Sequence, residues 1–416
     1  MIFFYNLFLF LYSVGIHIAS IWNMKARLWV KGRRNQKEII RKNDPNDKTV
    51  WMHCASLGEF EQGRPVLEKI KELYPSYKIV LTFFSPSGYE IRKSYQGADA
   101  VYYLPMDGEI NATSFINKIN PSLVIWIKYE FWYYYLTALK EKNIPVLLVS
   151  GIFREGQPFF KWYGTIWRKM LGSFHTIFVQ NELSFEILKK NSLSRNVIVG
   201  GDTRFDRVIG ISQKNDPLPP ALINFCKGKK VLVAGSTWIE DEKVLLHYTK
   251  VHPEINFIIA PHEIQKENLL SIKKYFGEPV FYSQMHEGKD PADKHVLIID
   301  NIGMLSRLYK LADITYVGGG FGEDGIHNIL EAAVYCKPVI FGPVYEKFAE
   351  AKELLERGGA FSIDNALELE ALLDKLFTEK EVLQKSGGEA GYYVHQHKGA
   401  TVKIMSYIEE KRLLTN

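Results

Sequence analysis

The segment that most constrains the fold of this chain is residues 314–343, where a glycine-rich turn separates two short apolar runs. The runs at 314–317 and 339–341 are β-branched and bounded by turn residues, which predicts two buried strands. Glycine permits positive φ and close approach of the backbone to a ligand, and the turn carries Gly318, Gly319, Gly320, Gly322 and Gly325. We expect a helix to begin near His327 and to present its backbone N–H groups to an anion. The segment therefore predicts a site for a nucleotide phosphate.

Glu331 adds to this prediction, because in a helix that starts at His327 the two side chains share one face. A carboxylate in that position can accept hydrogen bonds from ribose hydroxyls. Two alternatives remain open: an ordinary structural glycine turn, and the dinucleotide fingerprint G-x-G-x-x-G. The fingerprint normally opens its domain and precedes an acidic residue by about 20 positions, whereas the strand that follows here ends in Gly342-Pro343. A nucleotide-sugar site is favoured over both.

Positive charge is concentrated near the N-terminus. The chain has 416 residues, of which 46% are hydrophobic, and a net charge of +5, which predicts a folded protein of two or three domains. Residues 25–42 carry eight basic side chains and one acid, Glu38, for a net charge of +7. Because the remainder is slightly acidic, a nucleic-acid-binding surface on the globular part is not expected.

The basic segment follows an uncharged stretch, since residues 2–22 contain no Lys, Arg, Asp or Glu. A helix of that length would span about 31 Å, enough to cross the hydrocarbon layer of a membrane. A cleaved signal peptide has its charges before the apolar run, the reverse of the order here. The positive-inside rule then places residue 25 onward in the cytoplasm. Polar or small residues interrupt the stretch, so a helix that lies in the interface or packs on the protein remains the alternative: Asn6, Ser13, Gly15 and His17.

Cysteine usage and acidic motifs argue for chemistry without a metal or a disulfide. Cys54, Cys226 and Cys336 are odd in number and widely spaced, which is typical of a reducing compartment. The sequence contains no H-E-x-x-H motif and no Asp-x-Asp pair that could hold a divalent ion on a sugar diphosphate. We therefore expect no metal site and no cofactor.

Two series of apolar strands alternate with amphipathic helices, which predicts two parallel sheets with helices on both faces. The first series is expected at 50–54, 79–83, 123–126, 146–149, 176–179 and 197–199. The second is expected at 231–234, 257–260, 296–299, 314–317 and 339–341. A proline-rich stretch near 216–220 separates them, so two Rossmann-like halves facing a cleft are expected, with the carboxyl ends of both sheets at that cleft.

Glu59 is the candidate base of the first half, because it follows the strand 50–54 at the start of a helix. Leu57 and Phe60 would shield it, and desolvation would raise its pKa and suit it to general-base chemistry. The alternative is a capping role, in which Ser56 is the N-cap and Glu59 its capping-box partner. In the second half, residues 231–238 form another strand-to-helix junction at which an anion could bind. The acidic run 240–242 in the helix that follows is expected to be solvated.

The chain resembles the 3-deoxy-D-manno-octulosonic acid (Kdo) transferase family, which adds Kdo to a lipid A precursor at the inner membrane. The resemblance covers nearly the whole chain and rests on a set of motifs in a fixed order: the N-terminal apolar segment with 27–33 (RLWVKGR), 53–59 (HCASLGE), 130–132 (EFW), 201–206 (GDTRFD), 235–237 (GST), 300–303 (DNIG) and 325–331 (GIHNILE). It implies a GT-B fold, inverting and metal-independent transfer, CMP-Kdo as donor and a membrane-bound lipid A precursor (lipid IVA) as acceptor.

The resemblance also implies roles for individual residues. Glu59 matches the catalytic base of the family. Donor-binding positions are expected at Gly235, Ser236, Thr237, His262, Gly303, Gly325, His327, Asn328 and Glu331. Acceptor-binding positions are expected at Ser56, Gly58, Lys128, Glu130 and Arg154. The implied process is lipopolysaccharide biosynthesis at the cytoplasmic side of the cell inner membrane.

Three positions depart from the family pattern. Pro261 stands where the family has an arginine, Lys128 where it has an acid, and Ile152 where it has a second arginine. Lys128 or Arg154 is a candidate to replace the lost positive charge. His262 fits a ligand contact and a hydrogen-bonded core histidine equally well.

These features predict five parts of the chain. They are a transmembrane or membrane-associated helix at 1–24, a basic juxtamembrane segment at 25–47, an acceptor-binding Rossmann-like domain at 48–206, a linker at 207–228 and a donor-binding Rossmann-like domain with C-terminal helices at 229–416. Two other functions remain open. A different GT-B sugar-nucleotide transferase or epimerase would share the fold without needing the membrane segment, and a membrane-anchored scaffold would need neither Glu59 nor the ribose-binding carboxylate.

Overall fold

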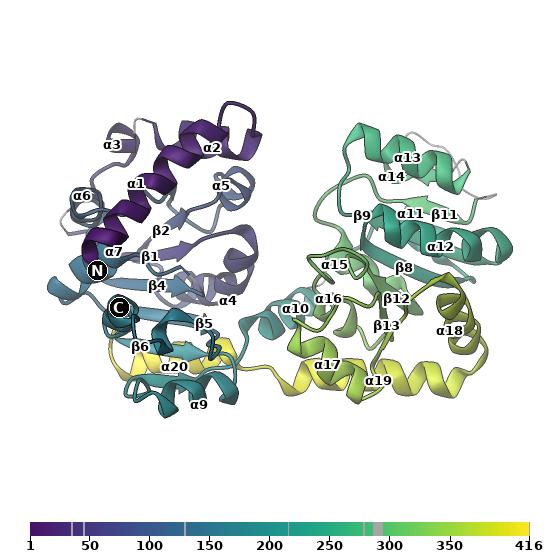
Figure 1. Cartoon of the computed structure of the whole chain (residues 1–416). Coiled ribbons are helices and arrows are strands. Elements are labelled where there is room, and N and C mark those ends of the chain that lie inside the picture. Colours follow the sequence, from purple (N-terminus) through teal and green to yellow (C-terminus); the bar gives the residue numbers. More distant parts are fainter. Residues whose placement is uncertain are drawn as a thin grey trace. The chain divides into compact units, whose positions relative to one another are not determined.

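The computed structural model describes residues 1–34, 36–44, 46–128, 130–214, 216–277, 279–285 and 294–415, without the side chains of 36 and 37. The chain divides into two compact units, of which the first comprises residues 1–207 with 398–416 and the second residues 208–397. Each unit is a parallel sheet with helices on both faces (Figure 1). The predicted α/β class with two Rossmann-like units is confirmed.

The first unit is built on a seven-stranded parallel sheet in the order β3-β2-β1-β4-β5-β6-β7. This order reverses direction between β1 and β4, which is where ligands bind in folds of this type. Six of its strands were predicted from the sequence, and the short β3 was missed. The strands are β1 (Thr49–Cys54), β2 (Lys78–Phe83), β3 (Ala100–Tyr103), β4 (Leu123–Ile127), β5 (Val146–Gly151), β6 (Thr176–Val179) and β7 (Val197–Val199).

Alternate side chains of these strands enter two different apolar cores, one on each face of the sheet. Trp51, Val124 and Trp126 pack on one face, whereas Val50 and Met52 pack on the other. The helices that cover the sheet are α4 (Leu57–Leu73), α5 (Pro86–Arg92), α6 (Glu109–Ile119), α7 (Tyr133–Glu141), η1 (Pro158–Phe160), α8 (Thr165–Leu171) and α9 (Glu182–Lys190). The chain then enters α10 (Thr203–Gln213), in which the boundary between the units falls.

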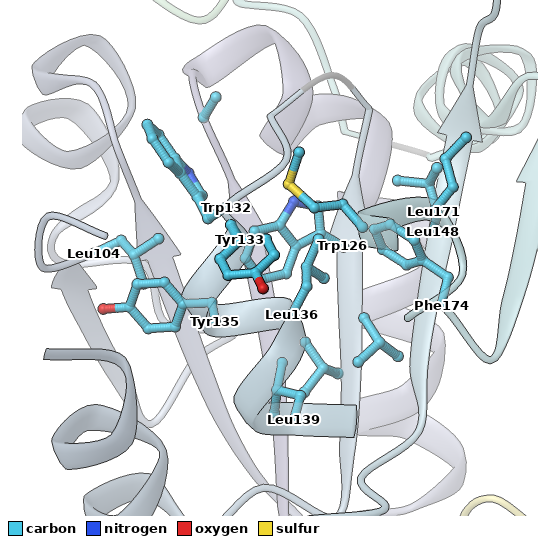
Figure 2. Packing of buried hydrophobic residues seen from close by; sticks show 14 of the residues in the cluster. Leu104, Trp126, Trp132, Tyr133, Tyr135, Leu136, Leu139, Leu148, Leu171 and Phe174 are labelled. Carbon is cyan, nitrogen blue, oxygen red and sulfur yellow. The ribbon is translucent and has the colours of Figure 1, made fainter. Parts of the chain in front are cut away.

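The helix α7 illustrates how these faces are covered (Figure 2). Its buried residues Tyr133, Leu136 and Leu139 recur every three positions, and Tyr135 is buried beside them. They pack against Trp126 and residues of the neighbouring elements in one cluster. Full burial of each leucine contributes about 1.5–3 kcal/mol.

The N-terminal helix α1 (Ile2–Ala19) is packed along the first unit rather than standing apart from it. Leu9 is buried, and Tyr5, Tyr12 and Ile16 pack against the same core, so a stripe at helical spacing faces the protein. The hydroxyl of Tyr5 donates to Asp107 at 2.6 Å and accepts from the backbone N–H of Tyr133 at 3.1 Å.

The rest of the surface of α1 is apolar and exposed. Phe3, Phe4 and Phe10 are 72%, 70% and 64% exposed, which is too much apolar area for a water-facing surface. Within the described part of the chain, α1 is the helix that is long and apolar enough to cross a membrane. The packing of α1 corresponds to the alternative of a helix packed on the protein. The helices α2 (Met24–Arg33) and α3 (Gln36–Ile39) follow it.

The second unit has its own seven-stranded parallel sheet, in the order β10-β11-β9-β8-β12-β13-β14. Its order reverses between β8 and β12. The predicted strands are present, and the short β10 and β14 were missed. The strands are β8 (Lys230–Thr237), β9 (Ile255–Pro261), β10 (Val280–Phe281), β11 (Val296–Ile298), β12 (Ile314–Val317), β13 (Val339–Phe341) and β14 (Ala360–Ser362).

Helices cover both faces of this second sheet, and the core between them is formed by residues such as Leu232, Leu245 and Leu373. The helices are α11 (Pro220–Cys226), α12 (Ile239–Val251), α13 (Lys266–Phe276), α14 (Tyr282–Met285), α15 (Leu305–Leu308), η2 (Tyr309–Leu311), α16 (Leu330–Ala333), α17 (Ala349–Glu356), α18 (Ala366–Thr378) and α19 (Lys380–Gln396).

The last helix, α20 (Ala400–Glu410), belongs to the first unit, although we expected the C-terminal helices to belong to the second domain. Ile404, Met405 and Ile408 enter the core of the first unit. Asp206 fixes the start of α20 by accepting the backbone N–H groups of Gly399 and Thr401, both at 2.6 Å. The apolar stripe of α20 gave no indication in the sequence of which sheet it would cover.

Candidate active-site residues in each unit

The residues predicted for the first unit gather at one edge of its sheet. Ser56, Gly58 and Glu59 follow β1, Lys128 and Glu130 follow β4, and Arg154 follows β5. These three strands are neighbours and parallel, so their carboxyl ends lie at the same edge. This edge includes the reversal of strand order between β1 and β4, where a substrate is expected to bind.

Glu59 lies in the first turn of α4 and is 8% exposed. Its carboxylate accepts the backbone N–H of Ala55, and its own backbone N–H donates to the Ser56 hydroxyl at 3.4 Å. Phe60 is fully buried beside it. The backbone N–H bond to Ser56 is the capping interaction that we named as the alternative to a catalytic role. A buried carboxylate at the carboxyl end of a strand is also where a general base is expected. The role of Glu59 stays a prediction.

A second cluster of polar side chains at this edge is centred on His53, which is fully buried in β1. Its Nδ1 lies 2.9 Å from the Thr82 hydroxyl, and its Nε2 lies 3.6 Å from Oε2 of Glu130. Burial lowers the pKa of His53, although Glu130 opposes this effect. Glu130 is held in place because its carboxylate accepts Trp132 Nε1 at 3.1 Å and its carbonyl accepts Trp126 Nε1 at 2.6 Å. The sequence identified Glu130 but not its partner His53.

Lys128 and Arg154 differ in how firmly the fold holds them. Lys128 has a φ of +57°, which is unusual for a residue with a side chain, and its backbone N–H donates to Val149 at 3.1 Å. Arg154 is exposed in the loop after β5. Both positive charges belong to the same edge as Glu59, so this edge can attract an anionic acceptor.

The residues predicted for the second unit also gather at one edge of its sheet. They follow four strands that lie side by side, β11, β9, β8 and β12. Thr237 ends β8, His262 follows β9, Gly303 follows β11, and His327 follows β12. The reversal of strand order between β8 and β12 lies at the same edge, so this is the candidate nucleotide site.

The helix expected at His327 begins later, at Leu330, and contains only four residues. His327 and Asn328 precede this helix and lie outside it, so the prediction that Glu331 shares a helix face with His327 is wrong. Glu331 is instead linked to Asn328, whose side-chain amide donates to Oε1 of Glu331 at 3.2 Å. Asn328 and Glu331 therefore lie together. Because the helix begins only at Leu330, its N-terminus does not provide the phosphate site expected at His327.

Three aromatic rings form a stack beside these residues. The ring centroids of Trp238 and His262 are 4.7 Å apart, and those of His262 and His327 are 4.4 Å apart. The indole Nε1 of Trp238 donates to Nε2 of His327 at 3.1 Å. Burial, together with His262, lowers the pKa of His327 to about 4, so the ring is neutral at physiological pH. His262 is exposed, which excludes the core-histidine alternative.

Two acids in the run 240–242 are buried, although we expected the run to be solvated. Asp241 is fully buried and accepts the backbone N–H groups of Trp238 and Gly319, both at 2.9 Å, and the Tyr316 hydroxyl at 2.7 Å. It therefore ties the turn after β8 to the turn after β12. Glu242 accepts the Thr237 hydroxyl at 3.1 Å, and burial raises its pKa to about 7. The sequence showed three acids at a helix start and gave no sign of this role.

The glycines of the turn after β12 serve packing as well as ligand access. A Cβ atom at Gly318 would lie 2.4 Å from the carbonyl oxygen of Ser236, and one at Gly320 would lie 2.6 Å from the backbone of Gly342. The structural-turn alternative thus accounts for these two positions. Gly325 and Gly303 have φ values of +84° and +94°, which a side chain would strain.

The described residues contain no group of three or more His, Cys, Asp or Glu side chains that could hold a metal ion. Metal independence stays a prediction, because the chemistry itself is not tested by this observation.

Comparison with known proteins shows what the chain is similar to. Residues 24–207, most of the first unit, match the family model described as 3-deoxy-D-manno-octulosonic-acid transferase (Kdo transferase). Curated proteins of that name match along most of the chain. The chain is similar to the Kdo transferases over most of its length.

Two relatives show how far the similarity extends. A Kdo transferase from Aquifex aeolicus is 28% identical to the chain over 87% of its length and 98% of that protein. A bifunctional glycosyltransferase/methyltransferase from Fusobacterium nucleatum is 27% identical over 89% of the chain. The chain spans 56% of the length of this bifunctional protein.

Solved structures support the GT-B fold of this chain. The structure of Staphylococcus aureus MnaA with UDP has a TM-score of 0.60 at 14% identity, covering 89% of the chain and 98% of that protein. Acinetobacter baumannii MurG has a TM-score of 0.53 at 13% identity, covering 87% and 99%. At these identities the likeness shows the fold alone.

Proposed function

We propose that this chain is a Kdo transferase, which transfers Kdo from CMP-Kdo to the headgroup of a lipid A precursor in the synthesis of lipopolysaccharide. The observation that carries the proposal is the gathering of family-motif residues at the carboxyl edge of each sheet. Motifs from five separate stretches of sequence supply these edges, and the curated relatives that match along the chain are named for Kdo transfer.

The second unit is proposed to bind the donor. The departing CMP carries negative charge on its phosphate, which hydrogen-bond donors at the candidate nucleotide site would stabilise. Ser236, with a φ of +54°, lies near the end of β8, and Asn328 lies in the segment between β12 and α16. Asp241 links the residues that follow these two strands by accepting the backbone N–H groups of Trp238 and Gly319. Glu331 would accept hydrogen bonds from the ribose, and the exposed rings of Trp238 and His262 offer aromatic faces for the pyrimidine.

The first unit is proposed to bind the acceptor and to supply the base. Glu59 would accept the proton of the attacking primary hydroxyl of the acceptor as that oxygen attacks the anomeric carbon. Attack on the face opposite to CMP inverts the configuration at that carbon. Lys128 and Arg154 would attract the anionic acceptor. This step needs no metal, because the donor is already activated by its phosphate ester.

Membrane association is proposed through the exposed face of α1. Its phenylalanines would enter the boundary between headgroups and acyl chains, while the inward stripe of Leu9 and Tyr12 holds the helix against the first unit. The basic residues 25–42 follow α1 and would be attracted to anionic lipids on the cytoplasmic leaflet of the inner membrane. The enzyme would thereby meet an acceptor that is itself a lipid.

The chain shares its fold with UDP-GlcNAc 2-epimerase from Neisseria meningitidis, so a sugar-nucleotide epimerase is the second candidate, and a choice of donor tests the proposal. The purified protein is incubated with the acceptor and either CMP-Kdo or UDP-N-acetylglucosamine, and released nucleotide and isomerised sugar are measured. Acceptor-dependent release of CMP supports the proposal. Release of UDP or epimerised sugar, with CMP-Kdo left intact, would replace it by the alternative.

A further inference from the structure

A cavity of about 570 Å³ lies in the first unit between α1, α2, the segment after α2 and α6. Ser13 and His17 of α1 line one side of it, Trp29 and Arg33 of α2 a second, and Lys118 of α6 a third. The lining contains none of the six candidate active-site residues of the first unit. Arg33 contacts the carbonyls of Phe84 and Leu104, which follow β2 and β3, so the cavity lies beside the edge that carries Glu59.

Arg33 brings an uncompensated positive charge to this cavity. Its guanidinium is partly buried over the rings of Trp29 and Phe84, at 3.9 and 4.7 Å from their centroids. It donates to three backbone carbonyls, those of Phe84 at 2.8 Å, Leu104 at 3.0 Å and Trp29 at 3.5 Å. No carboxylate of the described residues forms an ion pair with it. Burial lowers the pKa of Arg33 to about 9, although nearby tyrosines and Glu130 oppose this effect.

Trp29 supplies an independent observation. The residue is 5% exposed, and its indole Nε1–H is a buried donor without a hydrogen-bond partner among the described residues. A buried donor without a partner costs about 1–3 kcal/mol, so such groups are normally satisfied by protein, water or ligand. The cavity wall therefore carries a buried N–H without a hydrogen-bond partner and a buried guanidinium without an ion pair, which favours an anion at this wall.

The remaining charges of the cavity lining favour an anion as well. Arg34 and Lys118 are basic, and Glu38 is the acid of the lining. Lys118 also donates to the carbonyl of Ile40 at 3.0 Å, which fixes the position of its ammonium group. With His17 neutral, Arg33, Arg34, Lys118 and Glu38 give the lining a net charge of +2.

The location of the cavity indicates where the anion comes from. Ser13 and His17 line it from α1, and Phe10 and Val14 lie three residues before them on the same helix. Phe10 is 64% exposed and Val14 39% exposed. A molecule bound in the cavity therefore has cationic groups at one end and an exposed apolar helix face at the other.

We propose that this cavity binds the phosphate headgroup of a membrane lipid, with Arg34 and Lys118 contacting the phosphate beside the Arg33 guanidinium and the acyl chains lying along the exposed face of α1. The bound lipid would fix the depth at which the first unit meets the membrane. The proposal does not depend on Kdo transfer, because it concerns binding to the first unit alone.

The test measures binding directly at Trp29. The full chain is labelled with 5-fluorotryptophan in an uncharged detergent, and the Trp29 signal is assigned in ¹⁹F NMR by its absence from Trp29→Phe. Dioctanoyl phosphatidic acid, dioctanoylglycerol and inorganic phosphate are then titrated separately. We expect the phosphatidic acid to shift the Trp29 signal saturably, and the other two to bind at least tenfold more weakly. Equal binding of inorganic phosphate, or of the phosphate-free lipid, would overturn the proposal, as would an unmoved signal with all three.

A charge-matched pair of variants completes the test. Arg34→Gln with Lys118→Gln removes two basic residues from the cavity, and Lys189→Gln with Lys190→Gln removes two exposed ones from α9 of the same unit. Each basic residue near an anionic headgroup contributes about fivefold in affinity, so the cavity variant should bind about 25-fold more weakly. The α9 variant should bind as the wild type does. Equal affinities of the two variants would show that the contact is elsewhere.

Discussion

Replacing Glu59 with Gln separates the catalytic role of this residue from its capping role. In the structure the Glu59 carboxylate accepts the backbone N–H of Ala55, and its own N–H donates to the hydroxyl of Ser56. The amide oxygen of Gln can still accept from Ala55, and the backbone bond to Ser56 is unaffected. The substitution therefore keeps the cap and removes the basicity.

The two roles predict effects of different size. Loss of the negative charge at the helix N-terminus should cost about 0.3–1 kcal/mol of stability, which lowers Tm by no more than about 2–4 °C in a domain of this size. Loss of a general base should lower kcat about 10²–10⁴-fold, which corresponds to about 3–5 kcal/mol in the activation barrier. A fall in activity of that size cannot come from the lost cap alone.

The assay compares Glu59→Gln with a control that loses a cap elsewhere. Asn181 is the N-cap of α9, where its side chain accepts the backbone N–H of Ser184 at 2.9 Å. Asn181→Ala should cost about 1 kcal/mol and lower Tm as much as Glu59→Gln does, while leaving kcat within about twofold of the wild type. CMP affinity should be unchanged in both. If Glu59→Gln keeps most of its activity, Glu59 is a structural cap and the proposed mechanism has no base.

Four further predictions follow from other parts of the molecule. Phe10→Asp should leave Tm unchanged and weaken flotation with anionic vesicles. Leu9→Asp, on the inward face of α1, should lower Tm by unfolding part of the first unit. If the two variants change Tm and flotation equally, the orientation of α1 is contradicted. Asp241→Asn should weaken CMP binding in calorimetry at least tenfold and cost about 1–3 kcal/mol of stability; unchanged CMP affinity would show that the two turns do not need this link. Burial raises the pKa of Glu242 to about 7 in the folded protein, so its deprotonation between about pH 4.5 and 7 destabilises the fold. Glu242→Gln should therefore raise Tm by about 2–4 °C over wild type at pH 8 and change it little at pH 4. A gain in Tm that does not depend on pH would refute the raised pKa of Glu242. Activity with ready-made CMP-Kdo should survive EDTA, and a loss restored by Mg²⁺ would contradict metal independence.

Much of the fold follows from apolar runs that are local in the sequence. Eleven strands were predicted because each is a continuous apolar run bounded by turn residues, as expected for parallel strands buried on both faces. The strands that were missed, β3, β10 and β14, are short and half-buried, so their sequences lack such a run. The motifs also indicated which strand ends carry polar residues.

What the sequence did not predict depends on contacts between distant segments. Asp241 is buried because Gly319, 78 positions away, donates to it, and no local pattern records that bond. The assignment of α20 to the first unit depends on Asp206, nearly two hundred positions earlier. Arg33 was counted as part of a basic juxtamembrane segment, and the sequence did not show that three aromatic rings surround its guanidinium. In each case the burial of the residue depends on contacts with segments that are distant in the sequence.

The most direct test of the central claim is the mass of the lipid product. The purified chain in detergent is given CMP-Kdo and a tetraacylated lipid A precursor, and the lipid is analysed by mass spectrometry, with Glu59→Gln run in parallel. We expect the precursor to gain one or more whole Kdo units with the wild type, and little or no gain with the variant over the same time. A precursor of unchanged mass after incubation with folded, CMP-binding protein would contradict the assignment of this chain as a Kdo transferase.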